Sequence, residues 1–203
     1  MSIALALTAA AASATPVSYA STFQNTTFRI STIDGSPNSL ALEILGALSA
    51  SGDWASAVGF DNFALKDIGS GITGGTVSPG TWSTSLLELT ANGCTGGGSG
   101  GVCFDANPVV ALTDNMVFRI DLSFSAGHGL EFGDNGPHLK VRFVSGSGRK
   151  VGSLLSTNLG QSDLVCDAGA LCRDEPNADV PEPGSLALVG LALIGVAAAR
   201  RRR

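Results

Sequence analysis

Two segments in the second half of the chain alternate strictly between apolar and polar residues, and this alternation limits the possible folds more than any other property of the sequence. Residues 118–124 read Phe-Arg-Ile-Asp-Leu-Ser-Phe, and residues 139–143 read Leu-Lys-Val-Arg-Phe. Successive side chains of a strand point to opposite faces, so a period of two predicts β-strands with one buried face. Residues 128–137 are rich in Gly, Asp and Asn, which predicts a loop between the two strands.

Weaker strand patterns lie at 22–33, 40–45, 58–65 and 82–89. The segment at 40–45 stays open between strand and helix, because one face of a helix would also fit Leu40, Ile44, Leu45 and Leu48. Short strands separated by turn residues, without alternating helices, predict an all-β fold: an antiparallel, jelly-roll-like β-sandwich. We expect this domain at residues 15–160, followed by a flexible polar linker at 161–180.

The N-terminus has the pattern of a secretory signal peptide at residues 1–14. Residues 3–12 are apolar and lead into Ala12-Ser13-Ala14, the small-x-small pattern that signal peptidase requires after Sec-dependent export. Ser18-Tyr19-Ala20 is a second possible cleavage site. No Lys or Arg precedes Arg29, so we expect the true translation start to lie upstream of Met1.

The C-terminus combines three elements in a fixed order. Prolines on both sides of an acidic residue hold an extended segment, because proline fixes φ and donates no hydrogen bond. An uncharged apolar stretch follows at 185–199, about 22 Å long as a helix against about 30 Å of hydrocarbon. It predicts a short single transmembrane helix, with the terminal arginines in the cytoplasm. The residues are Val180, Pro181, Glu182 and Pro183, then Arg200, Arg201, Arg202 and Arg203.

This order of elements resembles the PEP-CTERM sorting signal of exopolysaccharide-producing Gram-negative bacteria, which we assign to residues 181–203. The resemblance implies that the protein is exported and held transiently in the inner membrane. It also implies an exosortase partner that processes the chain near Pro-Glu-Pro and delivers it to the cell envelope or extracellular matrix.

Charge is distributed unevenly along the chain. Residues 21–179 contain eight basic and sixteen acidic side chains. Phosphate binding depends on clustered Lys and Arg, so a domain this acidic is not expected to bind nucleic acid.

Four cysteines in an exported protein favour disulfides, because that compartment is oxidising. Three pairings are possible, and proximity in the sequence favours Cys94–Cys103 and Cys166–Cys172. The first pair closes a glycine-rich loop, for which the chain-entropy model gives about 2.5–3 kcal/mol of stabilisation. Zinc is the alternative, but it usually requires Cys-x-x-Cys spacing, which is missing.

No arrangement in the sequence predicts catalysis. The histidines are His128 and His138, and the formal Gly-x-Ser-x-Gly match around Ser99 lacks the strand-to-helix context of a nucleophile elbow. We therefore expect no enzyme, cofactor or metal site. Calcium is an alternative at the oxygen-rich clusters 61–62, 105–107 and 131–135, although Asx residues in turns explain them equally well.

The sequence is compatible with three functions. The leading hypothesis is a non-enzymatic structural protein of the envelope or biofilm. The first alternative is a carbohydrate-binding module for exopolysaccharide, with Trp54, Trp82 and Tyr19 as the residues suited to stacking on sugars. The second is a secreted hydrolase, which requires two carboxylates at a set separation.

Overall fold

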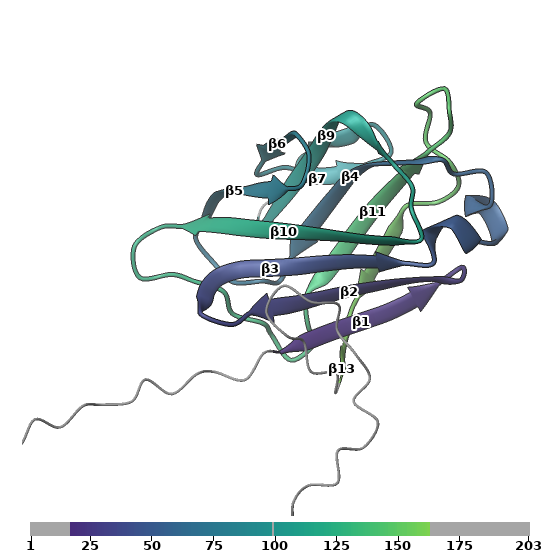
Figure 1. The fold of residues 1–203 in the computed structure, drawn as a ribbon. Coiled ribbons are helices and arrows are strands. Elements are labelled where there is room, and N and C mark those ends of the chain that lie inside the picture. The colour runs from purple at the N-terminus through teal and green to yellow at the C-terminus, as the bar shows by residue number, and fades with distance from the viewer. Residues whose placement is uncertain (1–16, 99, 163–203) are drawn as a thin grey trace, which may run out of the picture. The chain divides into compact units, whose positions relative to one another are not determined.

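The computed structural model describes residues 17–98 and 100–162, which form two antiparallel sheets packed face to face (Figure 1). Sheet A has the strand order β13-β1-β2-β3-β10-β5, sheet B has the order β12-β11-β4-β9-β6, and β7 pairs with β8 in a separate hairpin. The strands are β1 Ser18–Phe23, β2 Thr26–Ile33, β3 Ser36–Leu45, β4 Gly59–Lys66, β5 Ile72–Ser78, β6 Trp82–Ser85, β7 Glu88–Thr90, β8 Gly93–Gly96, β9 Gly101–Ala111, β10 Asn115–Phe124, β11 His138–Val144, β12 Leu155–Asn158 and β13 Gly160–Ser162. Two 3-10 helices, η1 Ala47–Ser49 and η2 Gly52–Trp54, follow β3.

The two alternating segments are strands, as predicted, in β10 and β11. Along β10, Phe118 and Ile120 are buried in the core while Val117 and Arg119 face outward. The all-β, antiparallel character of the domain is therefore confirmed.

The segment that was open between strand and helix is a strand. Leu40, Leu42 and Ile44 of β3 alternate into the core, which a helix cannot do. Leu48, which the helical alternative placed on the same face, lies in η1 and is 65% exposed.

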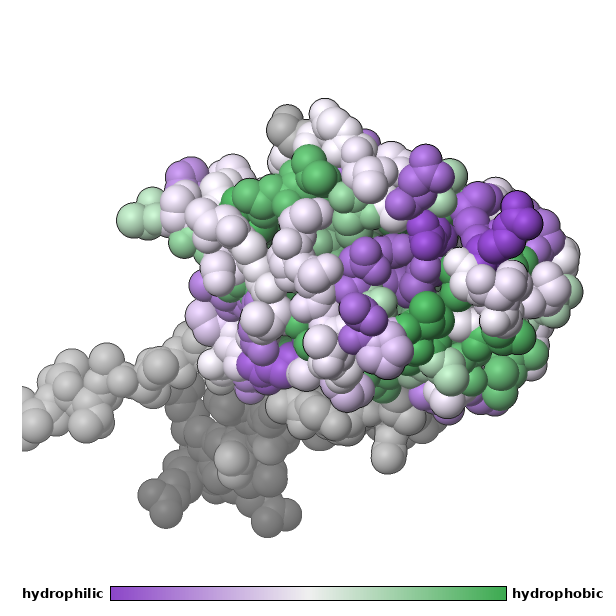
Figure 2. Space-filling view, turned by 90° about the horizontal axis from the view of Figure 1, so that it is seen from above, coloured by the Kyte–Doolittle hydropathy of each residue, from purple (hydrophilic) through white to green (hydrophobic). Residues whose placement is uncertain are grey.

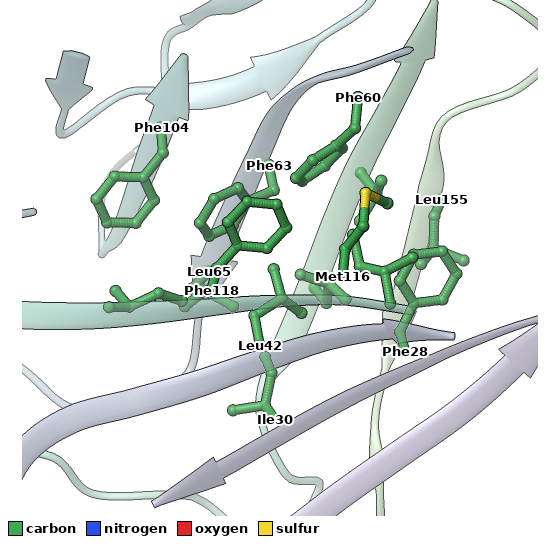
Figure 3. Close-up of a cluster of buried hydrophobic side chains, with 14 of the residues drawn as sticks. Phe28, Ile30, Leu42, Phe60, Phe63, Leu65, Phe104, Met116, Phe118 and Leu155 are labelled. Carbon is green, nitrogen blue, oxygen red and sulfur yellow. The ribbon is translucent and has the colours of Figure 1, made fainter. Parts of the chain in front are cut away.

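The core lies between the sheets and draws on both of them (Figure 3). Phe28, Ile30 and Leu42 project from sheet A toward Phe60, Phe63, Leu65 and Phe104 of sheet B. One contiguous cluster of this kind makes the two sheets a single sandwich. Trp54 closes it at one end, 1% exposed, with its ring centroid 4.8 Å from that of Phe143.

The pairing of the chain's outer strands determines where distant residues meet. The last described strand, β13, hydrogen-bonds only to β1, at the edge of sheet A. In that register Tyr19 lies opposite Gln161 and Ala20 lies opposite Gly160. Residues from the two ends of the domain are therefore neighbours.

None of the helices in the described part of the chain is long and apolar enough to cross a membrane. The predicted signal peptide, most of the predicted linker, and the predicted short transmembrane helix all lie outside the described residues.

Candidate functional site

A pocket of about 330 Å³ opens at the end of the sandwich where β1 begins and β13 ends. Its walls come from three places: the first residues of β1, the loop before β11, and the turn into β13. The loop is the glycine-rich segment that the sequence predicted between the two alternating strands. The lining residues are Tyr19, Phe132, Gly133, Asp134, Asn135, Gly136, Leu159, Gly160 and Gln161.

An aromatic pair forms the apolar part of this pocket. The ring centroids of Tyr19 and Phe132 are 5.0 Å apart, with their planes inclined by 50°. Both rings are half-buried and pack against the core. Their position is therefore set by the sandwich, while part of each ring stays accessible.

Gly136 allows the loop to approach the tyrosine ring. Its φ is +67°, a left-handed conformation that glycine adopts without strain. A Cβ at this position would lie 2.3 Å from the carbonyl oxygen of Leu159 and 2.9 Å from Cδ1 of Tyr19. Only a glycine fits between the ring and the β13 turn.

The polar part of the pocket consists of Asp134, Asn135 and Gln161, all exposed. Gln161 shares the sheet face of Tyr19, because directly opposed residues of antiparallel strands point the same way. No Lys or Arg lines the pocket. The site thus offers aromatic surface, two amides and one carboxylate, without a cation.

The β7–β8 hairpin covers part of the outer face of sheet B. It buries Leu89 against Ala64 and Cys103. Cys94 of the hairpin is joined to Cys103 of β9 by a disulfide with 5.6 Å between the Cα atoms, which is the pairing that sequence proximity favoured. Cys166 and Cys172 lie outside the described residues.

Ion pairs add to this attachment. Glu88 accepts hydrogen bonds from Lys66 at 2.5 Å and from Lys140 at 3.2 Å, and the two lysines hold the pKa of Glu88 below its ordinary value. Arg142 donates to both oxygens of Asp61 and to the carbonyl oxygen of Ala91 in the hairpin turn. The hairpin is therefore held by a disulfide, a small apolar cluster and charged groups together.

Two of the three oxygen-rich clusters that were candidates for calcium lie in strands rather than in turns. Asp61 and Asn62 are buried in β4, where Arg142 occupies the Asp61 carboxylate, and residues 105–107 belong to β9. Only the cluster at 131–135 lies in a loop, and its residues 132–135 line the pocket. Among the described residues, no three His, Cys, Asp or Glu side chains converge on a metal position.

The histidines lie apart from the pocket. His138 begins β11 and uses both ring nitrogens, toward Asn158 Oδ1 at 2.5 Å and Ser156 Oγ at 3.0 Å. His128 is exposed, and its Nδ1 lies 2.9 Å from Ser70 Oγ. In a catalytic triad, one ring nitrogen of the histidine faces the serine and the other is hydrogen-bonded to a buried acid. Among the described residues, no carboxylate is hydrogen-bonded to His128 or His138. The serine of the formal elbow, Ser99, lies outside the described residues.

The three candidate stacking residues have different environments. Trp54 is buried, and Trp82 is half-buried among Phe60, Phe63 and Phe118. Tyr19 lines the pocket where β1 begins and β13 ends. Sequence reasoning missed Phe132 as its aromatic partner and Gln161 as its polar neighbour. No local signal marks either residue, because strand pairing and loop closure bring them to Tyr19.

Other apolar side chains are exposed outside the pocket. In the view of Figure 2, apolar surface occupies separate areas interrupted by polar residues. Exposed apolar side chains that stand singly are normal on a protein surface and by themselves mark no site. The residues concerned are Phe23, Leu48, Val58, Leu86, Leu87, Val109 and Val117.

Comparison with known proteins identifies one segment. Residues 179–203 match the PEP-CTERM protein-sorting motif, which confirms the resemblance seen in the sequence. The match covers the C-terminal tail and none of the sandwich. No curated protein and no solved structure matches the chain.

Proposed function

We propose that this exported protein, which carries a PEP-CTERM motif for sorting by an exosortase to the envelope or extracellular space, is a non-enzymatic structural component of that envelope or of a biofilm matrix. In this proposal the membrane segment is temporary. The exosortase cleaves near Pro181-Glu182-Pro183 and releases a jelly-roll-like sandwich that needs no cofactor.

The observation that carries the proposal is the position of the motif, which follows a domain held together by its own core and a disulfide. A disulfide suits a domain that works in an oxidising compartment. The lining of the Tyr19 pocket contains one carboxylate, Asp134, so this pocket gives no support to two-carboxylate hydrolysis.

The test is mass spectrometry of the mature protein from cells with and without an active exosortase. We expect the Arg200–Arg203 block to be absent from the protein of the active strain and present in the protein of the inactive strain. Glu182→Gln is the matched variant, because it changes the motif and leaves the sequence of the sandwich unchanged. An intact C-terminus in both strains contradicts processing.

A second candidate function is carbohydrate binding, and one observation favours it: Tyr19 and Phe132 form an accessible aromatic wall beside polar groups. Sugars present C–H faces to aromatic rings and hydroxyls to amides and carboxylates. Binding of the mature protein on a glycan array, compared with the same protein after thermal unfolding, tests this function as a whole.

A further inference from the structure

The geometry points to the Tyr19–Phe132 pocket as a binding site for one neutral sugar unit of a glycan chain. This inference rests on the second candidate function above and specifies its site and ligand class. The pocket volume of about 330 Å³ lies at the small end of the range of ligand sites, which is about 300–1,000 Å³. That volume suits a single ring with an open side toward solvent.

The hydrogen-bonding groups match hydroxyl groups. Asp134 accepts hydrogen bonds, while Asn135 and Gln161 both donate and accept. None of these three side chains is hydrogen-bonded to another described residue, so binding breaks no internal contact. Sugar hydroxyls also donate and accept, and they therefore pair with all three side chains.

The charge of the pocket selects the class of sugar. Asp134 is its one charged lining residue, and no lysine or arginine is present to pair with a carboxylate, sulfate or phosphate. A uronic acid would place a second negative charge beside Asp134 without compensation. Neutral hexoses carry no such cost.

The apolar wall provides the surface for stacking. Tyr19 lies against Gly136, and its ring centroid is 5.0 Å from that of Phe132, so its ring does not have to be ordered when the ligand binds. A ring that is already positioned loses little conformational entropy on binding. Tyr19 is also the only tyrosine of the chain, so a tyrosine signal reports on this pocket alone.

The experiment uses the mature protein, as it is after processing, with ¹³C-labelled tyrosine, and follows the Tyr19 ring by NMR. The probes are maltose, cellobiose and lactose, with glucuronic acid as the anionic counterpart. We expect a saturable shift of the Tyr19 signal with at least one neutral disaccharide and none with glucuronic acid. Asp134→Ala is expected to weaken binding about tenfold and Gln161→Ala about fivefold, as for lost hydrogen bonds to charged and neutral groups.

Asp114→Ala is the matched control, since it removes an exposed aspartate outside the pocket and should bind like the wild type. All these variants change exposed side chains, so an unchanged melting temperature shows that they fold. No Tyr19 shift with any neutral probe overturns the inference, as does wild-type affinity in Asp134→Ala and Gln161→Ala. Tighter binding of glucuronic acid overturns the neutral class.

These outcomes are distinguishable from failure of the functions on which the inference rests. Glycan-array binding without a Tyr19 shift leaves carbohydrate binding in place and overturns this pocket. No array binding at all removes both. The sorting proposal depends only on the mass of the mature chain and stands or falls separately.

Discussion

At the Trp54 end of the sandwich, the side chain of Asp53 links two loops by accepting hydrogen bonds from Gln24 and from Ser153. The β1–β2 turn consists of Gln24 and Asn25, with φ of 49° and 63°, a left-handed conformation that is costly for non-glycine residues. Gln24 donates a side-chain hydrogen bond to Asp53 Oδ1, and Ser153 donates to Oδ2 from its backbone nitrogen at 2.7 Å and its hydroxyl at 2.8 Å. These contacts support the turn.

The hydrogen bonds from Gln24 and Ser153 lower the pKa of Asp53 from 3.8 to about 2. A carboxylate with a depressed folded-state pKa stabilises the fold above its unfolded pKa and loses that effect as pH falls through its folded pKa. We therefore expect Asp53→Asn to melt below the wild type at pH 6, with the difference shrinking between about pH 4 and pH 2. Melting curves across this range check it, and a difference that stays constant down to pH 2 contradicts the assignment.

At the scale of elements, the β7–β8 hairpin explains why β9 was not predicted. The consecutive residues Val102, Cys103 and Phe104 are all buried, because the core covers one face of β9 and the hairpin covers the other. Burial on both faces erases the period-two pattern on which strand prediction depends. Gly101 and Pro108 further weaken the strand signal.

Replacing both cysteines of the described disulfide tests the attachment of this hairpin. Closing a loop between cysteines nine positions apart is worth about 2.7 kcal/mol in the chain-entropy model. We expect Cys94→Ala/Cys103→Ala to lower the melting temperature by about 5–10 °C for a chain of this size.

Cys166→Ala/Cys172→Ala is the matched control, because these cysteines lie in the predicted linker. We expect it to leave the melting temperature of the sandwich unchanged. An equal loss in both double variants would show that the stabilisation does not come from the hairpin.

At the scale of the whole molecule, the pairing of the domain's two ends bears on where the signal peptide is removed. Ser18, Tyr19 and Ala20 supply every partner of β13. Cleavage after Ala20 would remove these residues, leave β13 unpaired and take Tyr19 out of the pocket. Cleavage after Ala14 leaves β1 whole.

We therefore expect the mature protein to begin at Thr15 rather than at Ser21. N-terminal sequencing of the secreted protein gives the answer directly. Changing Ala14 to a bulky residue, as in Ala14→Leu, should block cleavage, while Ala20→Leu should not. A mature chain that begins at Ser21 contradicts this reading of β1.

The sequence alone identified what depends on local order. Alternation at 118–124 and 139–143 predicted β10 and β11, and the order of proline, apolar stretch and arginines identified the sorting motif. Short separation favoured the Cys94–Cys103 pair. Each of these signals is complete within a few neighbouring residues, so no knowledge of the fold is required to see it.

Tertiary structure decided which of the remaining residues work together. It buried Trp54, buried Asp61 beside Arg142, and brought Gln161 and Phe132 to Tyr19. The physical reason is that strand register and loop closure join residues far apart in the chain, and these contacts leave no periodic trace in the sequence.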